Sequence, residues 1–217
     1  MDNIKSPIAF QCPALHCIVG NSMCGKSFYT KKLCLNANRL FMEPVEKIYY
    51  CYEIYQSSFE ELESSGVIFH KGCPTKTLIQ EWGDDCIQHK LLILDDLMSD
   101  CTNSLDIFKL FTIYAHHLNF SVLFLKQTIF DTGRHGRSLS LNTQIYHLFE
   151  NSRDQLNVQN LLRQMFPTSY KKVMDAYIQA TSIPFRPLVI SLHPKRKKEY
   201  QLSSEIFHQN PVVYKVE

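Results

Sequence analysis

Short apolar stretches and longer amphipathic stretches alternate along this chain. Seven of the short stretches are rich in β-branched or aromatic residues and end at polar or turn residues, which predicts β-strands. These predicted strands span residues 15–19, 47–52, 67–70, 90–96, 121–127, 144–150 and 187–193. Helical periodicity begins at Lys26, near Phe59 and near Lys76, and it covers residues 105–117, 154–165 and 170–181.

The strand patterns also indicate how the sheet is built. The runs LLIL and SVLFL lack alternation of polar and apolar residues, as expected for strands buried on both faces of a parallel sheet. Strands that alternate with helices predict an α/β fold, with a mostly parallel central sheet and helices on both faces. Ligands of such sheets bind at the carboxyl ends of the strands.

Composition limits the class of protein. The 217 residues are 45% apolar and 20% charged, which predicts a single globular domain with a core at about 12–193 and a basic segment and tail at 194–217. No apolar run approaches the roughly 20 residues of a membrane span, and MDNIKSPIAF does not resemble a signal peptide, so we expect an intracellular protein. Eight cysteines lie in the first half without a CxxC pair, which favours reduced thiols.

A glycine-rich stretch follows the first predicted strand. GNSMCGKS matches G-x-x-x-x-G-K-[ST], between the strand and the helix that a phosphate-binding loop requires. Glycines in this motif allow successive N–H groups to face a phosphate, while the lysine reaches the β- and γ-phosphates and the serine binds Mg²⁺. The predicted nucleotide-binding residues are Gly20, Asn21, Ser22, Met23, Cys24, Gly25, Lys26, Ser27 and Phe28.

Two further strand ends carry polar residues that fit this chemistry. KLLILDDL ends in Asp95, which we predict to hold Mg²⁺ with Ser27, and in Asp96, which we predict to polarise the attacking water. SVLFLKQ ends in Gln127, which would face the γ-phosphate as a sensor. The base-reading N/T-K-x-D motif of GTPases and an arginine-rich lid are both absent from the sequence, so ATP hydrolysis is the predicted activity.

An ordered series of motifs resembles one family. CIVGNSMCGKS, LLILDDLM, LFTIYAHHLNFSVLFLKQTIF, GRHGRSLSLNTQIYHLFENSRDQ and LLRQMFP are similar to the FtsK/HerA-type, poxvirus-like packaging ATPases of Polinton (Maverick) elements, adintoviruses and related eukaryotic DNA viruses. The resemblance covers about residues 12–193. It implies a RecA-like fold, a homo-oligomeric ring, a capsid or portal vertex as partner, and ATP-driven translocation of double-stranded DNA. It also places Lys26 and Ser27 at phosphate and Mg²⁺, and Gln127 as sensor.

The chain departs from this family at three positions. Met23 and Cys24 replace the small residues common in such loops and bring a bulky pair and an oxidisable thiol to the phosphates. Asp96 replaces the glutamate of cellular relatives, which shortens its reach to water by one methylene.

Ring ATPases usually need an arginine from the neighbouring subunit. Arg153 and Arg137 are the candidates here, and an ordinary surface ion pair is the alternative for each. Arg134 and Arg137 also lie in the basic, glycine-broken stretch FDTGRHGRSLSLN, predicted either to bind the DNA backbone or to form a solvated turn.

A basic run follows the last predicted strand and comprises Lys195, Arg196, Lys197 and Lys198. Its composition fits a nuclear-import signal, a DNA-contacting patch or a solvated run. PVVY, at residues 211–214 of the tail, fits pairing with a sheet edge or docking on another subunit.

Together these features predict a DNA-packaging ATPase of a virus or transposon, located in the nucleus of an infected cell or in the virion. Two other functions remain open, a replication helicase or AAA+-like ATPase, and a P-loop protein that uses ATP to control assembly.

Overall fold

A single sheet runs through the computed structural model, which describes residues 5–84 and 88–216. Residues 1–4, residues 85–87, which include Cys86, and residue 217 lie outside the described residues. The strands are β1 (Leu15–Val19), β2 (Lys47–Tyr52), β3 (Ile68–Lys71), β4 (Lys90–Asp95), β5 (Phe120–Lys126), β6 (Ile145–Leu148), β7 (Leu188–Ser191), β8 (Leu202–Ser204) and β9 (Val212–Val213). Their order is β3-β2-β4-β5-β1-β6-β7-β8-β9.

Strand direction divides this sheet into two parts. The six strands from β3 to β6 in the spatial order are parallel, whereas β7, β8 and β9 join the edge antiparallel. The register pairs Val19 of β1 with Lys126 of β5 and with Leu148 of β6, so the carboxyl ends of these three strands are level. The prediction of an α/β fold with a mostly parallel sheet is confirmed.

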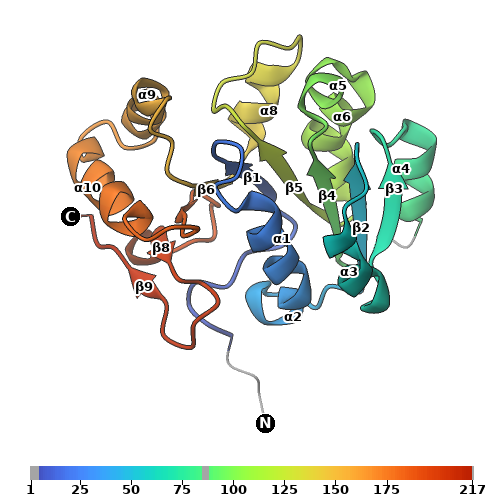
Figure 1. Ribbon diagram of the computed structural model, residues 1–217, viewed down its shortest axis with the longest axis horizontal. Helices are drawn as coiled ribbons and strands as arrows, with labels where there is room; N and C mark the ends of the chain where they lie inside the picture. Colours follow the sequence, from blue (N-terminus) through green and yellow to red (C-terminus); the bar gives the residue numbers. More distant parts are fainter. Residues whose placement is uncertain (1–4, 85–87, 217) are drawn as a thin grey trace.

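The helices connect the strands and cover both faces (Figure 1). They are α1 (Lys26–Leu35), α2 (Ala37–Leu40), α3 (Glu60–Ser64), α4 (Lys76–Trp82), α5 (Met98–Asn103), α6 (Leu105–Lys109), α7 (Ala115–His117), α8 (Gly136–Asn142), α9 (Gln155–Met165) and α10 (Tyr170–Thr181). A π-helical turn, Leu110–Tyr114, joins α6 to α7, and 3₁₀ turns span Ser57–Phe59 and Lys198–Tyr200. None of the helices in the described part is long and apolar enough to span a membrane.

Apolar side chains on the two faces of the sheet build the core. On one face Ile18, Ile93 and Leu125 pack with residues of α1, α2 and α3. On the other face Leu94 and Phe124 pack with the helices from α4 to α8, and β6 and β7 pack with α9 and α10. Strands β4 and β5 are buried at every position, as their unbroken apolar runs predict.

The structure differs from the sequence prediction at several elements. The stretch FDTGRHGRSLSLN is not a continuous loop, because its second half forms α8. Helix α5 directly after β4 and strand β8 in the tail were not predicted. PVVY was predicted either to pair with a sheet edge or to dock on another subunit, and its two valines form β9, which pairs with β8.

Candidate nucleotide-binding site

The glycine-rich loop lies between the carboxyl end of β1 and the start of α1. Gly25 has a φ of 98°, a left-handed backbone that favours glycine, and it immediately precedes α1. Gly20 has no room for a side chain, since a Cβ would lie 2.5 Å from Cys24 Sγ and 2.7 Å from Phe149 Cβ. Both glycines are therefore required by the path of the backbone.

The N-terminus of α1 is open toward this loop. Tyr29 N–H donates to Gly25 O at 2.9 Å, so the N–H groups of the first turn, Lys26 to Phe28, precede the helical ladder. The first turn has neither an acidic residue nor a side-chain cap, which leaves the positive end of the helix dipole uncompensated. An anion such as a phosphate is the ligand that this helix end attracts.

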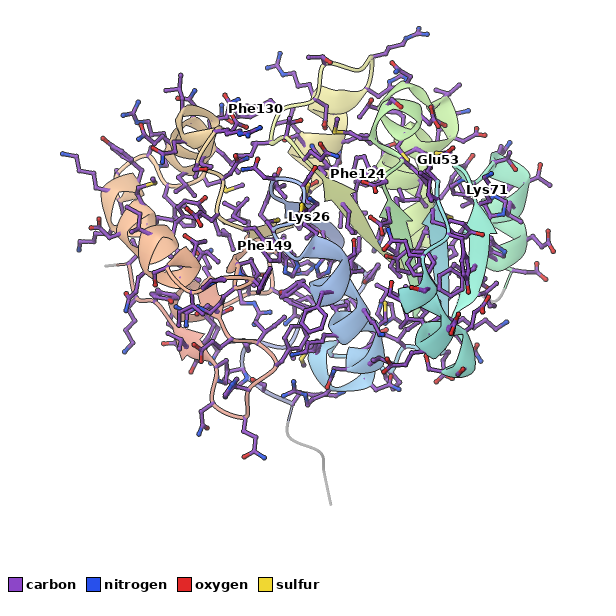
Figure 2. The ribbon with its side chains drawn as sticks, viewed as in Figure 1. Lys26, Glu53, Lys71, Phe124, Phe130 and Phe149 are labelled. Atoms are coloured by element: carbon purple, nitrogen blue, oxygen red, sulfur yellow. The ribbon has the colours of Figure 1, made fainter. Side chains whose placement is uncertain are left out.

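Lys26 directs its ammonium group back across the loop. Its Nζ donates to Gly20 O at 2.7 Å and to Asn21 O at 2.9 Å. Figure 2 shows Lys26 at the top of α1, near Phe149 from the segment after β6. The amine therefore lies against the backbone of the loop that is predicted to bind the phosphates.

The two predicted aspartates take different environments at the end of β4. Asp95 is 4% exposed, and Tyr50 of the neighbouring strand β2 donates its hydroxyl to Asp95 Oδ2 at 2.6 Å. Burial raises the pKa of Asp95 to about 6, against the lowering effect of the Tyr50 hydrogen bond. Asp96 is exposed and has a φ of 55°, which is unusual for a residue with a side chain. One carboxylate is thus fixed in the sheet and the other faces solvent.

Gln127 follows β5 and is exposed. Gly20 N–H donates a hydrogen bond to the carbonyl of Lys126, the preceding residue, at 3.2 Å. The peptide that links Lys126 to Gln127 therefore lies beside the glycine-rich loop. The predicted neighbourhood of Gln127 and the loop is therefore present.

A buried ion pair lies beside Gln127 and was not predicted from the sequence. Lys126 Nζ pairs with Asp131 and donates to Ile129 O at 3.1 Å, and the side chains of both partners are almost fully buried. The only signal in the sequence is a lysine within an apolar strand and an aspartate five residues later. The ion pair closes the turn after β5 and thereby fixes the backbone that carries Gln127.

The arginine candidates are all exposed. Arg153 lies in the turn after β6, at the same edge of the sheet as the glycine-rich loop. Arg134 precedes α8 and Arg137 lies within it. Within the described part of the chain, no hydrogen bond or ion pair connects these guanidinium groups to the glycine-rich loop, and their roles stay predictions.

The prediction for the basic run after β7 needs a correction at one residue. Lys195, Lys197 and Lys198 are exposed, but Arg196 is only 7% exposed. Its guanidinium donates to the carbonyls of Pro7, Ile8 and Ala9 and to Ser191 Oγ. The prediction that Arg196 belongs to a DNA-contacting or import-signal surface is wrong, because its donors are occupied by the N-terminal segment.

Met23 and Cys24, the two unusual residues of the glycine-rich loop, lie in different environments. Met23 is 96% exposed with a φ of 66°, so its bulk points into solvent. Burial raises the pKa of the Cys24 thiol, which disfavours the thiolate through which the oxidation expected from the sequence would proceed. The cysteines within the described residues form no disulfide.

The donor set at this site suits Mg²⁺. Ser27 supplies a hydroxyl on α1. Asp95 is two residues after Ile93 on β4 and therefore lies on the same face of the sheet, which packs against that helix. Both donors are hard oxygens, and Mg²⁺ commonly uses one or two protein ligands together with phosphates and water. No cluster of three or more His, Cys, Asp or Glu side chains within residues 5–84 and 88–216 forms a metal site by itself.

The combination of this loop, an uncapped helix and a carboxylate at the end of a second parallel strand of the same sheet is specific to one class. The chain is a P-loop ATPase. Residues 11–183 match the family described as Poxvirus A32 protein, and the chain belongs to that family. A comparison with curated proteins finds no match.

Solved structures support the same fold. The genome packaging NTPase B204 from Sulfolobus turreted icosahedral virus 2 in complex with ATP-gammaS has a TM-score of 0.57 and 12% identity, covering 94% of this chain and 98% of B204. Its complex with AMPPCP has a TM-score of 0.51 and 11% identity, covering 98% of this chain and 100% of B204. At these identities the similarity concerns the fold.

Proposed function

We propose that this ATPase moves double-stranded DNA into the capsid of a virus or transposon. The observation that carries the proposal is the nucleotide site in a chain that matches the A32 family over residues 11–183. The similarity in fold to a viral genome packaging NTPase that binds ATP analogues adds support.

The site residues divide the work of hydrolysis. The loop N–H groups and Lys26 hold the phosphates, and Ser27 and Asp95 hold Mg²⁺, which screens the charge on the phosphates when bound. Asp96, which is exposed to solvent just after β4, orients and deprotonates the attacking water. Gln127 contacts the γ-phosphate and responds to its loss.

A direct connection joins this site to the basic segment around Arg134. Helix α5 begins two residues after Asp96, and its Thr102 O accepts from His135 N–H at 2.8 Å. Arg134 N–H donates to Asn103 Oδ1 at 3.1 Å, and Gly133 packs so closely on Thr102 that a Cβ would overlap it. A shift at the end of β4 therefore reaches Arg134 through α5.

This connection supports Arg134 and Arg137 as contacts to the DNA backbone, with the exposed lysines 195, 197 and 198 as a second candidate set. Contacts to phosphates do not distinguish the bases, so the affinity should be similar for any duplex. The affinity should also fall steeply with salt, because neutralising phosphates releases counterions. Alanine at both arginines should flatten the salt slope by about one unit per lost contact. Tight, sequence-selective binding that survives high salt would favour an origin-recognising replication protein.

A ring of identical subunits completes the site in this proposal. Arg153 from one subunit faces the γ-phosphate of its neighbour, with Arg137 as the alternative. Mixing Lys26→Ala subunits with Arg153→Ala subunits should restore hydrolysis at interfaces where the former supply the arginine and the latter the phosphate site. If mixed rings form and no ratio restores activity, Arg153 is not the residue that acts in trans.

The remaining partners follow from packaging. In this proposal the ring docks on a capsid or portal vertex, and the protein works in the nucleus of an infected cell, with association with the virion as the alternative. If the three exposed lysines serve nuclear import, replacing them should reduce nuclear accumulation more than DNA-stimulated hydrolysis.

Phosphate release with and without duplex DNA tests the proposed function. Hydrolysis should rise with protein concentration and with duplex DNA of any sequence, and folded Lys26→Ala should lack it. A rate of hydrolysis that does not change when DNA is added would favour a protein that uses ATP to control assembly. Preference for single-stranded DNA with strand separation would favour a helicase.

A further inference from the structure

An aromatic residue occupies a strained turn beside the glycine-rich loop. In the segment between α10 and β7, Arg186 N–H donates to Ile183 O at 3.3 Å, which closes a turn over Pro184 and Phe185. Phe185 has a φ of 64°, at the position where a type II turn normally requires glycine or asparagine. A bulky side chain in this conformation is a true outlier, and such strain is concentrated at ligand sites.

Arg186 fixes this turn to its surroundings. Its Nε donates to Ala180 O at 2.6 Å and its Nη2 donates to Gln179 O at 2.9 Å, both at the end of α10. Its Nη1 forms an ion pair with Glu205, after β8. The turn is therefore held from two elements, and Phe185 keeps its strained position.

The ring of Phe185 borders the nucleotide site. A Cβ at Gly25 would lie 2.6 Å from Phe185 Cδ1, so the ring rests directly on the glycine that precedes α1. Although it makes this contact, Phe185 is 61% exposed.

A cavity of about 310 Å³ opens beside the ring. Its walls come from the glycine-rich loop, from Phe149 and Glu150 after β6, and from the turn that carries Phe185. Volumes of roughly 300–1,000 Å³ are typical of small-molecule sites, and this cavity is continuous with the loop that takes the phosphates.

We propose that Phe185 is the platform on which the base of the bound nucleotide stacks. This inference rests on the proposed nucleotide site and names the residue that holds the nucleoside end. An exposed ring that is fixed beforehand stacks on a flat base without an ordering cost. Stacking of a base on an aromatic side chain contributes roughly 5- to 150-fold in affinity.

The sharpest test is Phe185→Gly. Glycine suits a positive φ, so this variant keeps the turn and removes only the ring. Isothermal titration should show ADP binding weakened about 5- to 150-fold, while binding of inorganic tripolyphosphate, which has no base, stays unchanged. Phe185→Trp should retain ADP binding, and Ile178→Ala, at a side chain 56% exposed on α10, is the matched control.

The possible outcomes are distinct. Unchanged ADP binding in Phe185→Gly overturns the platform alone. Equal losses for ADP and tripolyphosphate mean that the ring acts through Gly25 on the phosphate loop, which also overturns it. If the wild-type protein binds neither ligand, the proposed function fails, and the platform fails with it.

Discussion

Replacing Arg196 by alanine removes a buried anchor between the two ends of the chain. Arg196 Nη1 donates to Pro7 O at 2.5 Å, and Nη2 donates to Ile8 O at 3.2 Å and to Ala9 O at 2.5 Å. Burial lowers the pKa of Arg196, which indicates that the charge is held at a cost. Alanine leaves these three carbonyls without their donor.

The magnitude follows from two opposing effects. Each buried carbonyl that loses its partner costs about 1–3 kcal/mol. The variant also removes a buried charge, whose desolvation cost of several kcal/mol offsets part of this loss. We expect a net loss of about 2–4 kcal/mol in the free energy of unfolding, which lowers the Tm by about 5–15 °C for a chain of this size.

Thermal and urea unfolding measure this loss, with Lys197→Ala as the control. Lys197 is the next residue in the same basic run but is exposed, so its replacement should stay within about 0.5 kcal/mol of wild type. If Arg196→Ala is as stable as Lys197→Ala, the anchor contributes nothing. If it weakens DNA binding at unchanged stability, the interpretation of Arg196 as a DNA contact is restored.

Three further perturbations test other parts of the structure. Asp96→Asn should retain binding of ATP analogues and lose roughly 10²- to 10⁴-fold in phosphate release, because only water activation is removed; lost nucleotide binding would assign Asp96 to Mg²⁺ instead. Gly133→Val should lower DNA stimulation severalfold while basal hydrolysis remains, since it forces the basic segment away from α5; unchanged stimulation would exclude this route. Burial holds the pKa of His16 well below its ordinary value and that of His147 at about 3, whereas both titrate near 6.5 when unfolded. Below pH 6.5 the unfolded chain binds more protons, so the free energy of unfolding should fall by about 3 kcal/mol between pH 6.5 and pH 5; flat stability over that range would contradict this reasoning.

The central strands and the glycine-rich loop could be predicted because local sequence determines them. LLIL and SVLFL are apolar at nearly every position, which only burial on both faces explains, and they form β4 and β5. Gly20 and Gly25 satisfy steric demands of the backbone within a few residues of each other. A regular pattern over six to eight residues carries this information.

Contacts between distant segments could not be predicted in this way. Arg196 is one of four consecutive basic residues, and it is buried by contacts that include three carbonyls of the N-terminal segment, more than 180 residues away. Helix α8 was not predicted because Gly133 before it and Gly136 at its first position suggested a loop, yet Leu139 packs into the core and stabilises the helix. Tertiary burial decides such cases, and a single sequence does not contain it in a local pattern.

The C-terminal tail shows why a boundary drawn after the last predicted strand was too early. Phe207 packs edge-on against Tyr29 of α1 at 5.1 Å between ring centroids, and Glu205 pairs with Arg186. Through Arg186 the tail fixes the turn that carries Phe185, and Phe185 rests on Gly25. Since the tail also adds two strands to the sheet, the nucleotide site is supported by both halves of the chain, and its geometry depends on residues beyond the motifs that identify it.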